Sequence, residues 1–81
     1  MVLMEAYIFL NTRPEMHWKV AENSLKINGV KIAHAVTGPY DVLVRVVFED
    51  METLGELLRK FHTIDGVKRT QTAIVMPAKL H

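Results

Sequence analysis

The sequence contains Ile27-Asn28-Gly29-Val30-Lys31 and repeats it, 37 positions later, as Ile64-Asp65-Gly66-Val67-Lys68. Each copy follows a segment whose apolar residues recur at helical spacing, and each precedes a run that is typical of a strand. A glycine just past a helix commonly ends it and lets the chain turn. Each copy therefore marks a helix-to-strand junction, and the chain is predicted to consist of two βαβ halves of equal length.

The sequence before, between and after the two copies of this motif predicts six helices and strands. They are a strand over 2–10, a helix over about 15–27, strands over 30–37 and 41–49, a helix over 51–62 and a strand over 67–76. Thr12 or Arg13 is expected near the cap of the first helix with Pro14 in its first turn, and Asp50 is expected to cap the second helix. This order predicts one α+β domain over residues 1–81, a ferredoxin-like βαββαβ sandwich. Its four-stranded antiparallel sheet has both helices on one face and the first and third strands at the centre.

The first strand is apolar on both of its alternating faces. Two helices cover only one face of a four-stranded sheet, so the other face is expected to meet a partner. A second copy of the same face is the most economical partner, because burying about 800 Å² on each side suits both a standard interface and a small core. The sequence therefore predicts a homodimer formed through the sheet.

The composition excludes several classes of protein. Lys plus Arg number 10 against 9 for Asp plus Glu, which gives a formal net charge of +1 and no basic run for nucleic acid or an anionic membrane. The absence of cysteine excludes disulfides and thiolate metal sites. No apolar run approaches membrane-spanning length, and the N-terminal stretch does not have the pattern of a signal peptide. We expect a cytoplasmic protein without membrane contact.

The sequence lacks the usual motifs of catalysis and metal binding. Its four histidines have no metal-ligand spacing, and no phosphate-binding glycine loop or nucleophile elbow is present. No metal and no cofactor are therefore expected.

Two polar segments remain as candidates for binding. In Val36-Thr37-Gly38-Pro39-Tyr40-Asp41, turn residues, an aromatic hydroxyl and a carboxylate meet between two strands. Asp41, Tyr40 and the turn amides suit both ends of an amino acid, although satisfying backbone donors is the ordinary role of an Asp beside a turn. In the last strand, Thr70 and Thr72 share one face with Lys68, Ile74 and Met76. Their hydroxyls suit a small zwitterion, and β-propensity alone explains them equally well.

These segments carry a resemblance to a known family. The turn over 36–41, following 27–30 and preceding a valine-rich strand, resembles the effector-binding RAM domain of the Lrp/AsnC (feast/famine) transcriptional regulators, and residues 64–72 look like its last strand. The resemblance implies a similar fold, dimerisation through the sheet, further assembly into octamers, and an amino-acid effector bound between dimers. It places the ligand site at Thr37, Gly38, Pro39, Tyr40, Asp41, Thr70 and Thr72.

The resemblance also shows a departure. Regulators of this family begin with a winged helix-turn-helix, whereas this chain starts directly at the first strand. The expectation is a stand-alone sensor, or a partner of full-length regulators, that does not bind DNA directly and is not an enzyme.

Two alternatives share the predicted topology. A small dimeric α+β-barrel enzyme, a cofactor-free monooxygenase or isomerase, would use His17, Trp18 and His62 in a cavity between helices and sheet. An RNA-recognition domain would stack bases on Tyr7 and Phe9, but these are expected on alternate faces, the basic-glycine-aromatic signature is missing, and the net charge is only +1.

Overall fold

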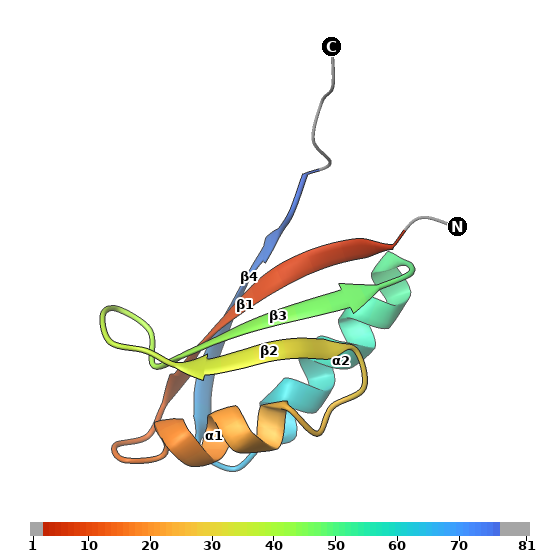
Figure 1. The fold of residues 1–81 in the computed structure, drawn as a ribbon. Coiled ribbons are helices and arrows are strands. Elements are labelled where there is room, and N and C mark those ends of the chain that lie inside the picture. The colour runs from red at the N-terminus through yellow and green to blue at the C-terminus, as the bar shows by residue number, and fades with distance from the viewer. Residues whose placement is uncertain (1–2, 77–81) are drawn as a thin grey trace.

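The computed structural model describes residues 3–76, and Val2, Pro77 and His81 lie outside this range. Its elements are β1 (Met4–Thr12), α1 (His17–Ser24), β2 (Val30–Ala35), β3 (Val42–Phe48), α2 (Met51–Thr63) and β4 (Val67–Ile74). The sheet order is β2-β3-β1-β4 with antiparallel neighbours, and both helices lie on one side of it (Figure 1). The predicted ferredoxin-like fold is confirmed, including the central places of the first and third strands.

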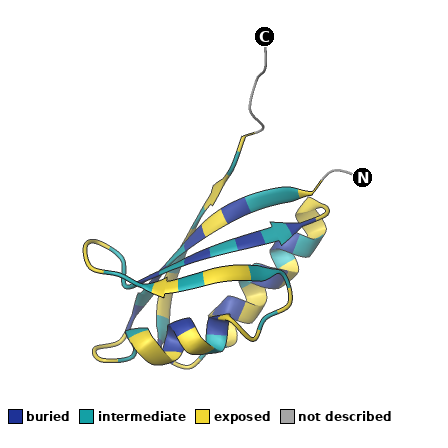
Figure 2. Cartoon of the chain, in the orientation of Figure 1, coloured by how far each residue is buried: buried dark blue, intermediate teal, exposed yellow. Residues whose placement is uncertain are grey.

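The helix-covered face of the sheet forms the core. Alternate residues of β1 and β3, such as Ile8, Leu10 and Val44, are fully buried, as Figure 2 shows along both strands. They pack against Val20 of α1 and Phe61 of α2. Each fully buried large side chain contributes roughly 1.5–3 kcal/mol relative to its exposed state. Because side chains alternate along a strand, these buried residues all lie on the face of the sheet that the two helices cover.

The first helix is shorter than predicted. Glu15 has a φ of 65°, and the amide of Met16 bonds back to Arg13 at 3.0 Å, so Pro14 and Glu15 form a turn before the helix. Met16 is the N-cap and makes no side-chain cap bond, so the expected cap at Thr12 or Arg13 is wrong. A positive φ cannot continue a right-handed helix, which is why α1 begins only at His17.

The two copies of the repeated motif have the same local structure. Gly29 and Gly66 share a φ of 101°, and the amides of Val30 and Val67 each bond the carbonyl three residues earlier at 3.2 Å. Left-handed backbone of this kind strongly favours glycine. The sequence repeat is therefore a structural repeat as well.

The other face of the sheet carries no element of residues 3–76, and we call it the open face. Its residues alternate with the core residues and are Glu5, Tyr7, Phe9 and Asn11 of β1, Ile32 and His34 of β2, Leu43, Arg45 and Val47 of β3, and Arg69, Gln71 and Ala73 of β4. Tyr7 and Phe9 lie on this same face, so the expectation that they alternate is wrong, because residues two apart in a strand point the same way. Glu5 and Arg45 form an ion pair of 2.6 Å.

Candidate functional site

The hairpin turn between β2 and β3 is fastened to the end of β1. The amide of Asp41 donates to the carbonyl of Leu10, and the Asp41 carboxylate accepts from the amide of Thr12 at 2.8 Å. The side-chain amide of Asn11 donates to the carbonyl of Pro39 at 2.9 Å. Asp41 therefore has the structural role that is usual beside a turn. Its second carboxylate oxygen, Oδ1, has no hydrogen-bond partner among the described residues.

Tyr40 links the turn to the open face. Its ring lies 4.9 Å from that of Phe9, and its hydroxyl donates to Gln71 Oε1 at 2.5 Å. Phe9 pairs with Gln71 on one side and with Leu43 on the other. The turn thus extends over β1 as far as β4.

A small pocket of about 210 Å³ lies beneath this turn. Its lining residues come from the turn, β1 and β4, and they are Asn11, Pro39, Tyr40, Arg69, Thr70 and Gln71. The volume falls below the roughly 300–1,000 Å³ of pockets for drug-sized ligands, so a small metabolite is the size that fits. Amide, hydroxyl and guanidinium groups make the lining suited to a polar, charged molecule.

The predicted site residues are only partly brought together. Pro39, Tyr40 and Thr70 line the pocket, and Asp41 lies next to it. Thr37 and Gly38 do not line it.

Thr72 and Thr70 pair with Ile8 and Leu10, so their side chains lie on the helix-covered side of the sheet, as does that of Ile74. The Thr70 hydroxyl lies 3.2 Å from His62 Nε2 of α2. Within one protomer, the two threonine hydroxyls and the Tyr40 ring are on opposite sides of the sheet. A ligand contact by both groups therefore needs a molecule at the sheet edge or a second subunit.

Sequence reasoning missed three lining residues, Asn11, Arg69 and Gln71. The signal was present in the pattern of the last strand, because the faces of a strand alternate and Arg69 and Gln71 stand between and beside the two threonines. The antiparallel register of β4 with β1 places them next to Asn11 and Phe9.

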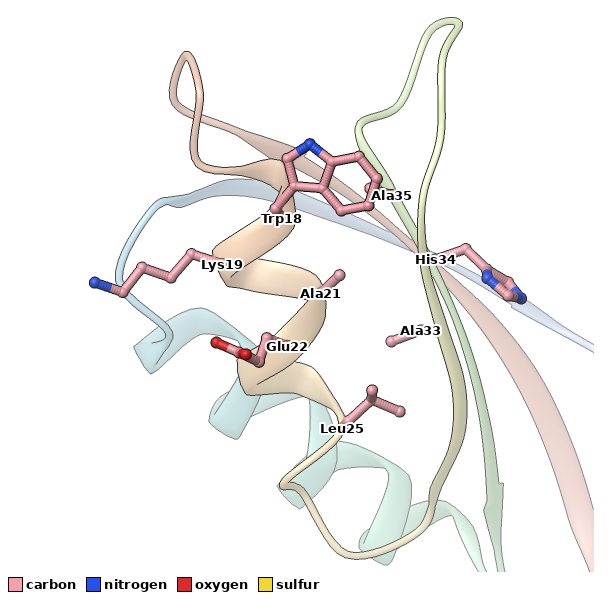
Figure 3. A pocket seen from close by; sticks show the side chains of 8 residues that line it. All are labelled: Trp18, Lys19, Ala21, Glu22, Leu25, Ala33, His34 and Ala35. Carbon is pink, nitrogen blue, oxygen red and sulfur yellow. The ribbon is translucent and has the colours of Figure 1, made fainter.

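A second hollow lies between α1 and the edge strand β2. It measures about 750 Å³ and is walled by Trp18 and Ala21 of the helix, by Leu25 just after it, and by Ala33 and Ala35 of the strand. The His34 side chain turns away from it (Figure 3). Trp18 is 71% exposed and Leu25 is 53% exposed, so both apolar side chains at the rim of this hollow keep much of their surface in water. The alanines are too small to fill the space under the helix.

The histidines of the enzyme alternative do not converge on this hollow. His17 and His62 are absent from its lining, and His62 instead contacts β4. Within residues 3–76 no group of three or more His, Asp or Glu side chains is placed to hold a metal ion. Neither of the two helices in this range is long and apolar enough to cross a membrane.

Comparison with known sequences identifies relatives across the whole fold. A family model described as the Lrp/AsnC ligand binding domain matches residues 5–80. An uncharacterized HTH-type transcriptional regulator of Pyrococcus horikoshii is 32% identical over 75 residues, which make up 91% of this chain and 48% of that protein. The chain spans about half the length of this regulator and of two similar curated relatives from other Pyrococcus species.

Solved structures show the same architecture. A Thermus thermophilus protein aligns with a TM-score of 0.88 at 25% identity, over 96% of this chain and 99% of that one. A transcriptional regulator of Neisseria meningitidis, solved as a complex with L-methionine, aligns with a TM-score of 0.79 at 25% identity, over 96% of this chain and 53% of that one. With the family match running over nearly every described residue, the chain belongs to the Lrp/AsnC ligand-binding domain family.

Proposed function

We propose that this domain binds a small amino acid at the hairpin turn and responds through its assembly state, without catalysing a reaction. The observation that carries the proposal is the pocket under the turn, which joins Asn11, Tyr40 and Arg69 at the edge of the open face. The Asp41 carboxylate beside it suits an ammonium group, and the pocket donors suit a carboxylate. The amino acid in the complex of the Neisseria meningitidis regulator supports this ligand class.

The open face is the proposed dimer interface. Tyr7 is 36% exposed in the single chain, and its neighbours Phe9, Leu43 and Val47 are partly exposed apolar side chains on the two central strands. A contiguous apolar surface of this kind on a small domain is typical of an interface. A second copy that presents the same face meets it by two-fold symmetry. In that dimer the Glu5–Arg45 ion pair becomes buried.

Ligand and assembly are coupled through Tyr40. Its ring packs on Phe9, which lies on the open face, while its hydroxyl holds Gln71 of the pocket. A ligand that reorders Tyr40 changes the surface that Phe9 offers to the second copy. It shifts the assembly equilibrium only to the extent that it binds the two states with different affinity.

Higher assembly, location and partners are proposed from the family resemblance. We propose that the dimers assemble further, with an octamer as the expected size, and that the domain acts in the cytoplasm as a stand-alone sensor or as a partner of full-length regulators. Thr70 lines the pocket in the same chain, and Thr37, Gly38 and Thr72 are proposed to contact the ligand from the neighbouring dimer. We also propose that the domain does not bind DNA directly and that it affects transcription through full-length regulators.

Isothermal titration calorimetry across the standard amino acids tests this function. At least one amino acid should bind the wild type, and Asp41→Asn should weaken that binding, because it removes the charge yet keeps an acceptor for the Thr12 amide. Glu56→Gln makes the same change of charge on the exposed surface of α2 and should leave binding unaltered. Absence of heat with every amino acid, together with an unchanged sedimentation profile, would contradict the proposal.

A further inference from the structure

We propose that the ligand is an acidic amino acid, aspartate or glutamate, whose side-chain carboxylate is bound by Arg69. This inference rests on the proposed amino-acid site and specifies its ligand. Arg69 is the charged residue among those that line the pocket. Its planar guanidinium matches a carboxylate with two parallel hydrogen bonds, a geometry that lysine does not offer.

Arg69, like Arg59, has no acidic partner within residues 3–76, and of these two arginines Arg69 is the one that lines the pocket. Arg13 is paired with Asp65 and Arg45 with Glu5, whereas Arg69 makes no ion pair within residues 3–76. It stands on the open-face side of β4, directly opposite Asn11 of β1. A guanidinium held beside a polar pocket without a carboxylate partner is suited to receive one from a ligand.

The hydrogen bonds around the pocket leave a second donor free beside Arg69. Gln71 Oε1 is occupied by the Tyr40 hydroxyl, so the Gln71 side-chain NH2 group is left as the donor. Asn11 uses its NH2 group on Pro39, which leaves its side-chain oxygen as an acceptor. The β4 side of the pocket therefore offers donors from Arg69 and Gln71, and the turn side offers acceptors.

Asp41 supplies the opposite charge at the other end. It is bonded to Leu10 and Thr12 from the β3 side of β1, while Arg69 pairs with Asn11 from the β4 side. Two strand spacings separate the two backbones, on the order of 10 Å, and both side chains extend from there. A molecule with an ammonium at one end and a carboxylate at the other matches this pair of charges.

The size of the pocket is compatible with this ligand. A volume of about 210 Å³ is sufficient for a short dicarboxylic amino acid. A dicarboxylate without an ammonium group, such as glutarate, has the same anionic chemistry at Arg69. Glutarate offers no ammonium group to Asp41, so we expect it to bind more weakly than glutamate.

Calorimetry with the intact chain tests the inference with glutamate, aspartate, glutamine, asparagine, lysine and glutarate. Glutamate or aspartate should bind wild type about tenfold or more tightly than its amide, which is the scale of one charge-assisted pair. Arg69→Gln should remove that preference and Arg69→Glu should transfer it to lysine. Lys68→Gln removes the neighbouring cation, which does not line the pocket, and should change nothing.

The outcomes separate this inference from the function on which it rests. Equal or tighter binding of a neutral amino acid, or an acidic preference that survives in Arg69→Gln, overturns the Arg69 assignment while amino-acid binding stands. Glutarate that binds as tightly as glutamate overturns the amino-acid part of the ligand assignment. Binding of no amino acid at all contradicts the proposed function itself. Because Arg69 is exposed on an edge strand, Arg69→Lys provides a folded variant that keeps the charge but loses the two-pronged geometry.

Discussion

The two faces of the sheet are built from the same strands but differ in how completely they are covered. On the helix side, Ile8 and Val44 are fully inaccessible, whereas on the open side their neighbours Tyr7 and Leu43 keep part of their surface in water. The helix side is uniformly apolar at its centre, while the open side carries the Glu5–Arg45 ion pair among aromatic and aliphatic residues. The same strands thus carry a fully buried core on one face and a partly exposed apolar surface on the other.

This difference separates two kinds of stability. Contacts on the helix side form within one chain, so they determine whether the domain folds. Contacts on the open side are completed between chains in the proposed dimer, so their contribution depends on protein concentration. Substitutions on the two faces should therefore have distinguishable effects.

The largest effect is expected on the helix side. Phe61→Ala leaves a cavity beneath α2 and should cost about 3–5 kcal/mol of unfolding free energy, a large part of the stability of a small domain. Urea denaturation followed by circular dichroism measures it. Trp18→Ala removes an even larger side chain from an exposed position, and a loss as large as that of Phe61→Ala would contradict the assignment of the core.

The next effect concerns the open side. Leu43→Glu places a charge opposite Phe9 and should weaken the dimer by about a hundredfold or more, since two buried, unpaired carboxylates result. Sedimentation equilibrium should then show monomers that retain the wild-type circular dichroism spectrum. A dimer of unchanged affinity would show that the open face is not the interface.

A smaller effect distinguishes two glycines, one packed against the first helix and one in the hairpin turn. Gly66 and Gly38 both have positive φ, so alanine at either adds backbone strain of about 1–3 kcal/mol. At Gly66 a new Cβ also lies 2.8 Å from Met16 Cε on the helix side, whereas at Gly38 nothing lies within 4 Å. Gly66→Ala should therefore destabilise the domain more in thermal melts. An equal decrease in Tm for Gly66→Ala and Gly38→Ala would mean that Met16 moves aside without a cost in stability.

The smallest effect is an acid dependence of α2. The amide of Thr53 donates to the Asp50 carboxylate at 2.8 Å, and this hydrogen bond lowers the pKa of Asp50. A carboxyl with a lowered folded-state pKa stabilises the fold above its ordinary pKa of about 3.9, and that contribution is lost as the pH falls through the folded-state value. Asp50→Asn keeps a capping side chain but should remove this part of the pH dependence of Tm between about pH 5 and 2. An unaltered profile would assign the acid sensitivity to other carboxylates.

The sequence predicts the fold well because the evidence for it is local or periodic. The two glycine motifs mark the junctions, the spacing of Leu54, Leu57 and Phe61 marks α2, and Asp50 is confirmed as its cap. The start of α1 was not predictable in the same way. It depends on the positive φ of Glu15, which the sequence at that position does not require.

The candidate site was predictable only in part, for a similar reason. The turn over 36–41 is visible in the sequence, but its docking on Asn11 and Gln71 depends on contacts between strands that are distant along the chain. Alternation shows that Thr70 and Thr72 share a face, whereas which face the helices cover is decided by packing. Their role as ligand contacts stays a prediction.

Sedimentation velocity of the wild-type chain, with and without a mixture of amino acids, tests the central claim most directly. The open face predicts a dimer or larger species at micromolar concentration, and the pocket beneath Tyr40 predicts that amino acids shift the distribution of species. A monomer at every concentration, with a sedimentation coefficient that amino acids leave unchanged, would contradict it.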